Sequence, residues 1–154
     1  MLASLELKIP PLAVGILIGL LMWLVARAIP HLGFEFTGRH WWAVVAAIVG
    51  MVFIALGIVS FRRADTTVNP MTPDRSSALV VSGIYRLTRN PMYLGFLFIL
   101  VGWAVSLSNI LSFLFLPVFV LYMNRFQIEP EERALASLFG SAFQSYRSHV
   151  RRWL

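Results

Sequence analysis

Residues 83–95 have the sequence GIYRLTRNPMYLG, in which a polar and aromatic segment leads directly into an apolar one. The change falls at Asn90-Pro91, where Asn suits a helix cap and Pro suits the first turn of a helix. A second polar cluster, EPEER at residues 129–133, follows the next apolar stretch. If both clusters lie on one side of a membrane, they can form a pocket that is reachable from water and from lipid.

The composition is that of a membrane protein. Of the 154 residues, 58% are hydrophobic and 13% are charged, and the mean hydropathy is +0.76. This is too apolar for an ordinary soluble domain, and the length fits a single domain over residues 1–154. Cysteine is absent and the three histidines are widely spaced, so we expect no disulfide and no metal site. The net charge of +6 is carried by residues that flank apolar segments, which favours lipid contact over nucleic-acid binding.

Four apolar segments are expected to cross the membrane as helices, at about residues 12–29, 41–61, 92–107 and 110–126. The polar interruption at residues 106–109 divides the last two, which predicts a tight helical hairpin, and Pro117 should kink its second arm. Gly95 and Gly102 are interpreted as packing positions. Small residues four apart, such as Ala46 and Gly50, permit close helix packing, although ordinary composition explains them equally well. The expected fold is therefore an all-α, polytopic integral membrane protein.

The C-terminal part, residues 129–154, is expected to form an amphipathic helix. Apolar residues recur there at three- and four-residue spacing, Pro130 suits the first turn, and Gly140 is a candidate bend. We expect this helix to lie against the membrane or against the polar connection at residues 62–90. Arg151, Arg152 and Trp153 are interpreted as anchors to lipid headgroups.

The arginines indicate the topology. Most of them lie in the second connection and at or beyond the last span, whereas the first connection carries only Arg27 and Arg39. The positive-inside rule then places both polar clusters and both termini on the cytoplasmic side, where charged cofactors are available.

The polar residues suit a zwitterionic ligand that bears a ring. Arg89 can hold a carboxylate or a phosphate, Glu131 and Glu132 can accept hydrogen bonds from an amine or a ribose, and Asn90 can donate and accept. Four aromatic side chains can pack on a ring or a cation: Tyr85, Tyr93, Phe143 and Tyr146. Since no nucleophile–base pair is evident, the site is expected to position reactants.

Two motifs carry a family resemblance. The first is Gly83-x-Tyr85-x-x-x-Arg89-Asn90-Pro91-x-Tyr93-x-Gly95, and the second is Glu131-Glu132-x-x-Leu135-x-x-x-Phe139-Gly140-x-x-Phe143-x-x-Tyr146. In this order they resemble the isoprenylcysteine carboxyl methyltransferase and phospholipid methyltransferase superfamily. The segment Thr66-Thr67-Val68-Asn69-Pro70 resembles its prokaryotic members, which favours a prokaryotic cytoplasmic membrane.

The resemblance implies that S-adenosylmethionine binds between residues 83–95 and 129–146. The cofactor-binding residues implied are Tyr85, Arg89, Asn90, Pro91, Tyr93, Glu131, Glu132 and Tyr146. It further implies that Arg89 and Glu132 are catalytic, and Asn69 and Arg125 are candidates for contact with the substrate. Asn90 stands where the family has histidine, so it can make a hydrogen bond there but cannot carry a proton.

The function implied is methyl transfer to a lipophilic acceptor that enters from the bilayer. An isoprenylcysteine-like carboxylate is the favoured acceptor, and a phospholipid amine or a thiol are the alternatives. Two other functions remain open. One is an NADPH-dependent membrane reductase of the sterol-reductase type, and the other is a non-enzymatic membrane scaffold.

Overall fold

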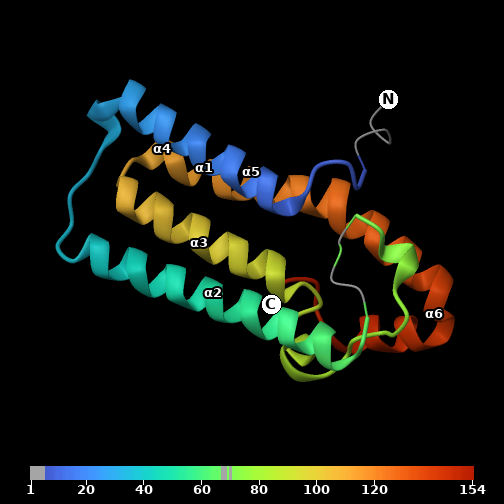
Figure 1. Ribbon diagram of the computed structural model, residues 1–154. Helices are drawn as coiled ribbons and strands as arrows, with labels where there is room; N and C mark the ends of the chain where they lie inside the picture. Colours follow the sequence, from blue (N-terminus) through green and yellow to red (C-terminus); the bar gives the residue numbers. More distant parts are fainter. Residues whose placement is uncertain (1–5, 67–68, 70) are drawn as a thin grey trace.

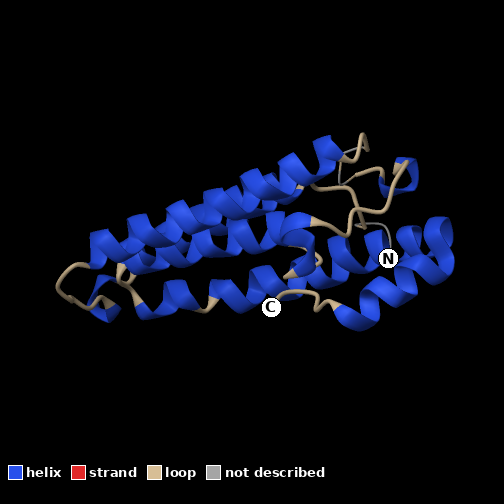
Figure 2. Cartoon of the chain, turned by 90° about the horizontal axis from the view of Figure 1, so that it is seen from below, coloured by secondary structure: helices blue, strands red, loops and turns tan. Residues whose placement is uncertain are grey.

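Three long apolar helices lie side by side: α1 (Pro11–Ala28), α2 (Arg39–Arg63) and α3 (Pro91–Leu107). In Figure 1, α3 lies between the other two and packs against both. The structure is a computed structural model that describes residues 6–66, 69 and 71–154, and it contains no β-strand in these ranges. Figure 2 shows the helices in blue and the long connection between α2 and α3 at one end of the bundle.

Three helices begin and end within two residues of the spans expected at residues 12–29, 41–61 and 92–107. Helices α1 and α2, and the nearly continuous helical stretch Ile110–His149, are long and apolar enough to cross a membrane. Helix α3 has 17 residues, a length of about 26 Å, which nearly spans the hydrocarbon core of a bilayer. The chain is therefore an all-α polytopic membrane protein.

Glycines bring α2 and α3 into close contact. A Cβ atom added to Gly50 would lie 2.5 Å from the carbonyl oxygen of Gly95, and one added to Gly95 would lie 2.5 Å from the carbonyl oxygen of Gly50. Gly102 approaches the carbonyl oxygen of Ala43 in the same way. Close approach of two backbones at small residues is a usual means of helix association in membranes. The predicted packing roles of Gly95 and Gly102 are confirmed, and Gly50, for which the sequence left the role open, packs in the same way.

The turn between α3 and the fourth span is held by side-chain caps. Ser108 adopts a left-handed conformation with φ 47°, and the Asn109 side chain accepts a hydrogen bond from Leu111 N at 3.1 Å. The same side chain donates to the carbonyl of Ile29 at 2.9 Å, which ties this turn to the end of α1. The predicted hairpin is confirmed.

The fourth span is broken where the proline prediction placed a kink. It consists of α4 (Ile110–Phe113) and α5 (Phe115–Tyr122), with the break at Leu114. The ring of Pro117 conflicts with the carbonyl of Phe113 four residues earlier, and this conflict explains the break. Ser112 fastens the span to α1 by donating to the carbonyl of Met22 at 3.1 Å.

The helix expected from residue 129 is present, but no loop separates it from the fourth span. The chain continues through a π turn, η5 (Met123–Ile128), directly into α6 (Glu129–His149). Pro130 cannot donate to the carbonyl of Phe126, and the wider π turn accommodates its ring. The free carbonyl of Phe126 accepts a hydrogen bond from Leu7 N at 3.0 Å, so the N-terminal segment satisfies it.

Helix α6 bends back at Gly140, as predicted. Gly140 has φ 49° and ψ −121°, a conformation that only glycine adopts readily, and the helix changes direction there. In Figure 1 the two halves of α6 lie at the same end of the molecule as the connection between α2 and α3. Helix α6 contacts that connection at the short 3₁₀ helix η3 (Pro73–Arg75).

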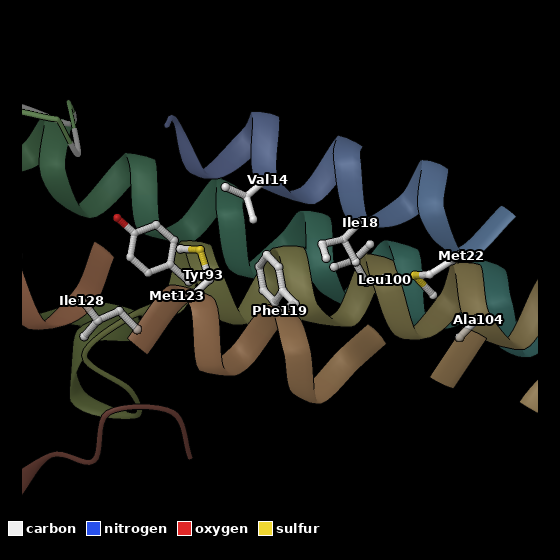
Figure 3. Packing of buried hydrophobic residues seen from close by; sticks show 9 residues of the cluster. All are labelled: Val14, Ile18, Met22, Tyr93, Leu100, Ala104, Phe119, Met123 and Ile128. Carbon is white, nitrogen blue, oxygen red and sulfur yellow. The ribbon is translucent and has the colours of Figure 1, made fainter. Parts of the chain in front are cut away.

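The apolar core lies where α1, α3 and α5 meet. In Figure 3, Phe119 lies in the middle of this cluster, with Met123 toward one side and Met22 toward the other, and each of these side chains is completely buried. Tyr93 and Ile128 extend this cluster toward the end of the bundle that carries the polar connection. The apolar core therefore continues to the polar end of the bundle, where Tyr93 and Ile128 belong to it.

We predict that Gly50→Ala lowers the free energy of unfolding by about 1–3 kcal/mol, because the new methyl group would overlap the backbone of α3. Thermal unfolding of the purified protein in detergent measures this. The matched control is Gly15→Ala on α1, where nothing lies within 4 Å of the added atom and stability should be unchanged or slightly higher. Equal stability of Gly50→Ala and the parent would contradict the proposed packing.

Candidate functional site

A cavity lies at the polar end of the bundle, between the start of α3, the connection before it, and α6. Its volume is about 100 Å³, or about 810 Å³ when the open space at its mouth is counted. Nearly every residue that the sequence singled out lines it: Asn69, Tyr85, Arg89, Asn90, Tyr93, Glu131, Glu132 and Tyr146. Residues 83–95 and 129–146, which are separated by two helical arms, therefore meet at one surface.

Arg89 lies on the turn between the 3₁₀ helix η4 (Gly83–Arg86) and α3. Its side chain is only 10% exposed, and Nη2 lies 3.1 Å from Glu132 Oε1. Burial lowers the pKa of Arg89, and the charge of Glu132 opposes that shift. Two further nitrogens of the guanidinium group, Nε and Nη1, are buried and have no partner in the described part of the chain. Because buried donors are nearly always satisfied, these atoms favour an acidic ligand.

Glu132 is held from both sides by arginines. Arg152 donates to Oε1 through Nε at 3.2 Å and to Oε2 through Nη2 at 2.7 Å, while Arg89 approaches Oε1. Only about a tenth of the Glu132 side chain is exposed, so the carboxylate requires these partners to remain charged. The prediction that Arg152 anchors the chain to lipid headgroups was wrong, since its guanidinium group belongs to this cluster.

The segment at residues 151–153, named here the C-terminal strap, lies across the turn that carries Arg89. Arg89 N donates to the carbonyl of Arg151 at 3.0 Å, and Thr88 Oγ1 donates to the carbonyl of Arg152 at 3.1 Å. Trp153 donates to Asn124 Oδ1 at 3.0 Å and packs on the core, so it does not serve as the predicted headgroup anchor. The strap therefore joins the turn before α3 to the π turn.

Asn90 contributes to the same attachment. It occupies the N-cap position of α3, but its side chain makes no capping hydrogen bond, contrary to the prediction. Its Nδ2 atom instead donates to the carbonyl of Arg152 at 2.9 Å. Pro91, the first residue of α3, is buried behind this turn and does not line the cavity.

Glu131 forms a second carboxylate centre beside Glu132. The Tyr93 hydroxyl donates to Glu131 Oε1, and Gln127 Nε2 donates to the same oxygen at 2.6 Å. Burial raises the pKa of Glu131 to about 7, while the two hydrogen bonds act in the opposite direction. The two adjacent glutamates therefore differ: Glu132 is fixed in an ion cluster, and Glu131 changes charge near neutral pH.

Aromatic side chains form another part of the wall. The Tyr146 hydroxyl donates to the carbonyl of Tyr85 at 2.7 Å, which joins the second half of α6 to η4. The ring of Tyr85 meets that of Phe61 edge to face at 5.4 Å, and Phe143 is almost fully buried. Burial raises the pKa of both Tyr85 and Tyr146, so both hydroxyl groups stay protonated at neutral pH. This wall suits a planar or cationic group of a ligand.

The two candidate substrate residues lie in different places. Asn69 lines the cavity and accepts a hydrogen bond from Met71 N at 3.0 Å, as a turn residue does. Its neighbours Thr67, Val68 and Pro70, which contributed to the prokaryotic resemblance, lie outside the described residues. Arg125 does not line the cavity. It pairs with Glu6 at 2.6 Å, and Glu6 also pairs with Arg133.

Sequence reasoning missed Arg152, Gln127 and Asn124. The charge of Arg152 resembled that of a headgroup anchor, and the two amides lie in a stretch expected to be the end of a span. The one signal available for Gln127 was its position four residues before Glu131, which places both side chains on the same face of a helix.

We predict that Arg152→Gln lowers the free energy of unfolding by about 1–3 kcal/mol, because Glu132 loses two charge-assisted hydrogen bonds. Arg151→Gln is the control, since that side chain is exposed and the residue contributes its main chain to the strap. Chemical unfolding of both variants in detergent gives the comparison. If both variants lost the same free energy of unfolding, the strap would depend on its overall charge and not on the ion cluster around Glu132.

Comparison with known proteins identifies relatives. Residues 38–142 match the family described as phospholipid methyltransferase. A 63-residue segment is 46% identical to an uncharacterized protein of Haemophilus influenzae, covering 41% of this chain and all of that protein. Over 116 residues the chain is 32% identical to protein-S-isoprenylcysteine O-methyltransferase A of Arabidopsis thaliana, covering 73% of this chain and 59% of the relative. A probable protein-S-isoprenylcysteine O-methyltransferase of Oryza sativa subsp. indica is 36% identical, with 69% and 56% covered. The chain thus spans little more than half the length of these plant relatives.

Proposed function

This chain belongs to the phospholipid methyltransferase family, and on that premise we propose that it transfers a methyl group from S-adenosylmethionine to a lipophilic acceptor. The cavity formed by residues 83–95 and 129–146 is the proposed site. The observation that carries the proposal is the meeting of these two segments around Arg89, whose Nε and Nη1 atoms lack an acceptor in the described chain. A membrane methyltransferase also accounts for the apolar spans beneath the site.

The residues of the cavity fit the chemical groups of the cofactor. S-adenosylmethionine supplies an electrophilic methyl group on a sulfonium centre. Arg89 has unsatisfied donors for a carboxylate, Glu131 gains negative charge near neutral pH and suits a cation, and the wall of Tyr85 and Tyr146 suits a ring. The surface thus offers a donor for a carboxylate, a carboxylate for a cation and aromatic rings for a base. A zwitterionic nucleoside carries all three of these groups.

The protein's contribution to the reaction is mainly alignment. Arg89 and Glu132 are proposed to be catalytic because their ion pair, reinforced by Arg152, fixes the guanidinium group that holds the cofactor, and this positions the methyl group against an acceptor carboxylate. Such a carboxylate is already nucleophilic, so this step needs no base. The apolar residues of the cavity, such as Met92 and Leu135, exclude water and admit the lipid part of the acceptor.

An isoprenylcysteine-like carboxylate remains the favoured acceptor, supported by the names of the plant relatives. A phospholipid amine is the second candidate, and one observation favours it. A protonated amine must lose its proton before it attacks, and Glu131, buried and with a pKa of about 7, can accept it. Family membership argues against the reductase and the scaffold, which are outcomes of the test below.

The arginine distribution supports a cytoplasmic site. Arg62, Arg63, Arg86, Arg133 and Arg147 lie at the cavity end, whereas Arg27 and Arg39 lie at the other end. We therefore propose that the cavity and both termini face the cytoplasm of a prokaryotic cell.

The test is incubation of purified protein with radiolabelled S-adenosylmethionine and three acceptors: a prenylated cysteine, phosphatidylethanolamine and a prenyl thiol. Label is expected in the prenylated cysteine, and Arg89→Gln should reduce the rate by 100-fold or more, on the order of the loss of an oriented charged contact. Arg86→Gln is the matched control, because Arg86 is exposed and does not line the cavity. Label in none of the acceptors, together with stabilisation by NADPH, would support the reductase instead. No transfer and no cofactor binding would support the scaffold.

The pH dependence gives a separate prediction. Because the folded-state pKa of Glu131 is raised to about 7, its side chain is mostly protonated at pH 6 and mostly charged at pH 8. Binding of the cationic cofactor should therefore strengthen from pH 6 to pH 8, as measured by calorimetry.

The free energy of unfolding changes with pH in the opposite direction. A raised carboxyl pKa stabilises the folded state at low pH, and this contribution of Glu131 is lost as the pH rises through 7.

Glu131→Gln tests this assignment. The amide oxygen can still accept from Tyr93 and Gln127, but it carries no charge at any pH. Cofactor binding by this variant should be weaker at pH 8 and nearly constant between pH 6 and pH 8. A variant with the same pH profile as the parent would show that another group titrates.

A further inference from the structure

A second cavity lies within the transmembrane part of the molecule, away from the proposed active site. Helices α1 and α2 both pack on α3 but leave part of its surface open between them, and this groove has a volume of about 770 Å³. Small residues form much of its lining: Gly15 and Gly19 on α1, Ala43 and Ala47 on α2, and Gly102 on α3. Its volume is within the range of ligand-binding cavities, roughly 300–1,000 Å³.

The groove is apolar along its length and cationic at one end. Its lining begins at Leu12 and ends around Trp23, Trp103 and Ser106. The last three residues also line a second hollow, together with Arg27 and Arg39, so the two spaces adjoin each other. A long apolar groove can hold an acyl chain, and cationic residues at its end can bind an anionic headgroup, so the groove suits an anionic lipid.

The rim arginines are free to bind an anion. Arg27 lies over the ring of Trp23 at 5.7 Å, and Arg39 contacts His40 through Nε at 3.4 Å. Within residues 6–66, 69 and 71–154 neither arginine pairs with a carboxylate, whereas Arg125 and Arg133 at the opposite end of the bundle do. Two guanidinium groups beside tryptophans at the edge of a span match a phosphate at headgroup depth.

A hydrogen bond between two of the helices that line the groove sets their separation. Trp103 Nε1 donates to the carbonyl of Gly19 at 2.9 Å, which fixes the spacing of α1 and α3 on either side of the groove. No side chain fills the space beside Gly15, since a Cβ atom there would have no neighbour within 4 Å. The space is thus a fixed feature of the packing.

We infer that this groove binds one anionic phospholipid, with its phosphate at Arg27 and Arg39 and an acyl chain along α3. This lipid is distinct from the proposed methyl acceptor. Arg89 precedes α3 and Ser106 lies near its end, so the rim is separated from the proposed active site by the length of the helix, about 26 Å. The inference therefore stands whether or not the chain transfers methyl groups.

The test is native mass spectrometry of the purified protein incubated with phosphatidylglycerol or phosphatidylcholine. We expect one phosphatidylglycerol retained per chain, at least about tenfold more tightly than phosphatidylcholine, from the charge-assisted contacts of the rim. The double variant Arg27→Gln/Arg39→Gln should abolish this preference. Arg63→Gln, an exposed arginine at the other end of α2 that lines neither cavity, should retain it.

Filling the groove provides the second arm. Gly15→Leu should reduce retention of both lipids, and it is expected to fold because the new side chain enters open space. Ala55→Leu, on an exposed face of α2 outside both cavities, is its control. A thermal shift with phosphatidylglycerol, present in the parent and absent in Gly15→Leu, confirms the result without reliance on mass spectrometry.

Equal retention of the two lipids, or unchanged retention in Gly15→Leu, would overturn the inference. So would a dimer mass that Gly15→Leu abolishes, since a second copy would then fill the groove.

Discussion

The polar end of this protein is organised around the carboxylate of Glu132. A charge that is nearly buried costs several kcal/mol unless it is paired, and here Arg89 and Arg152 supply the pairing from two directions. Each of the three residues comes from a different segment: the turn before α3, the first half of α6, and the C-terminal strap. The cluster therefore determines where these segments lie relative to one another, and the cavity follows from that placement.

The apolar spans supply the frame that the cluster needs, through breaks at particular residues. The π turn accommodates Pro130 and aims α6 over the start of α3, while Leu7 satisfies the carbonyl that Pro130 leaves free. Gly140 then turns the chain back, so that Tyr146 reaches the backbone of Tyr85. The π turn and the bend at Gly140 both lie at or beyond the end of a span, where irregular backbone has access to polar partners.

The sequence predicted the spans and most of the cavity because these depend on strong local signals. Apolar length defines a span. Pro117 restricts the backbone and Gly140 permits a conformation that other residues rarely adopt, and both effects hold in any fold. The family motifs placed Arg89 and Glu132 on the same surface. The strap could not be predicted in this way, because the role of Arg152 depends on a partner twenty residues earlier in the chain. A basic residue near an aromatic one is also typical of a membrane anchor, and only the tertiary structure separates the two roles.

The C-terminal strap has a consequence for the order in which the protein is assembled during its synthesis. Residues 151–153 follow all four membrane helices in the sequence, so Arg89 and Glu132 are synthesised before Arg152. We therefore expect the ion cluster to be completed only after these helices have been made. Assembly on this view has two stages: the apolar segments partition into lipid, and the ion pairing around Glu132 then closes the polar end of the bundle.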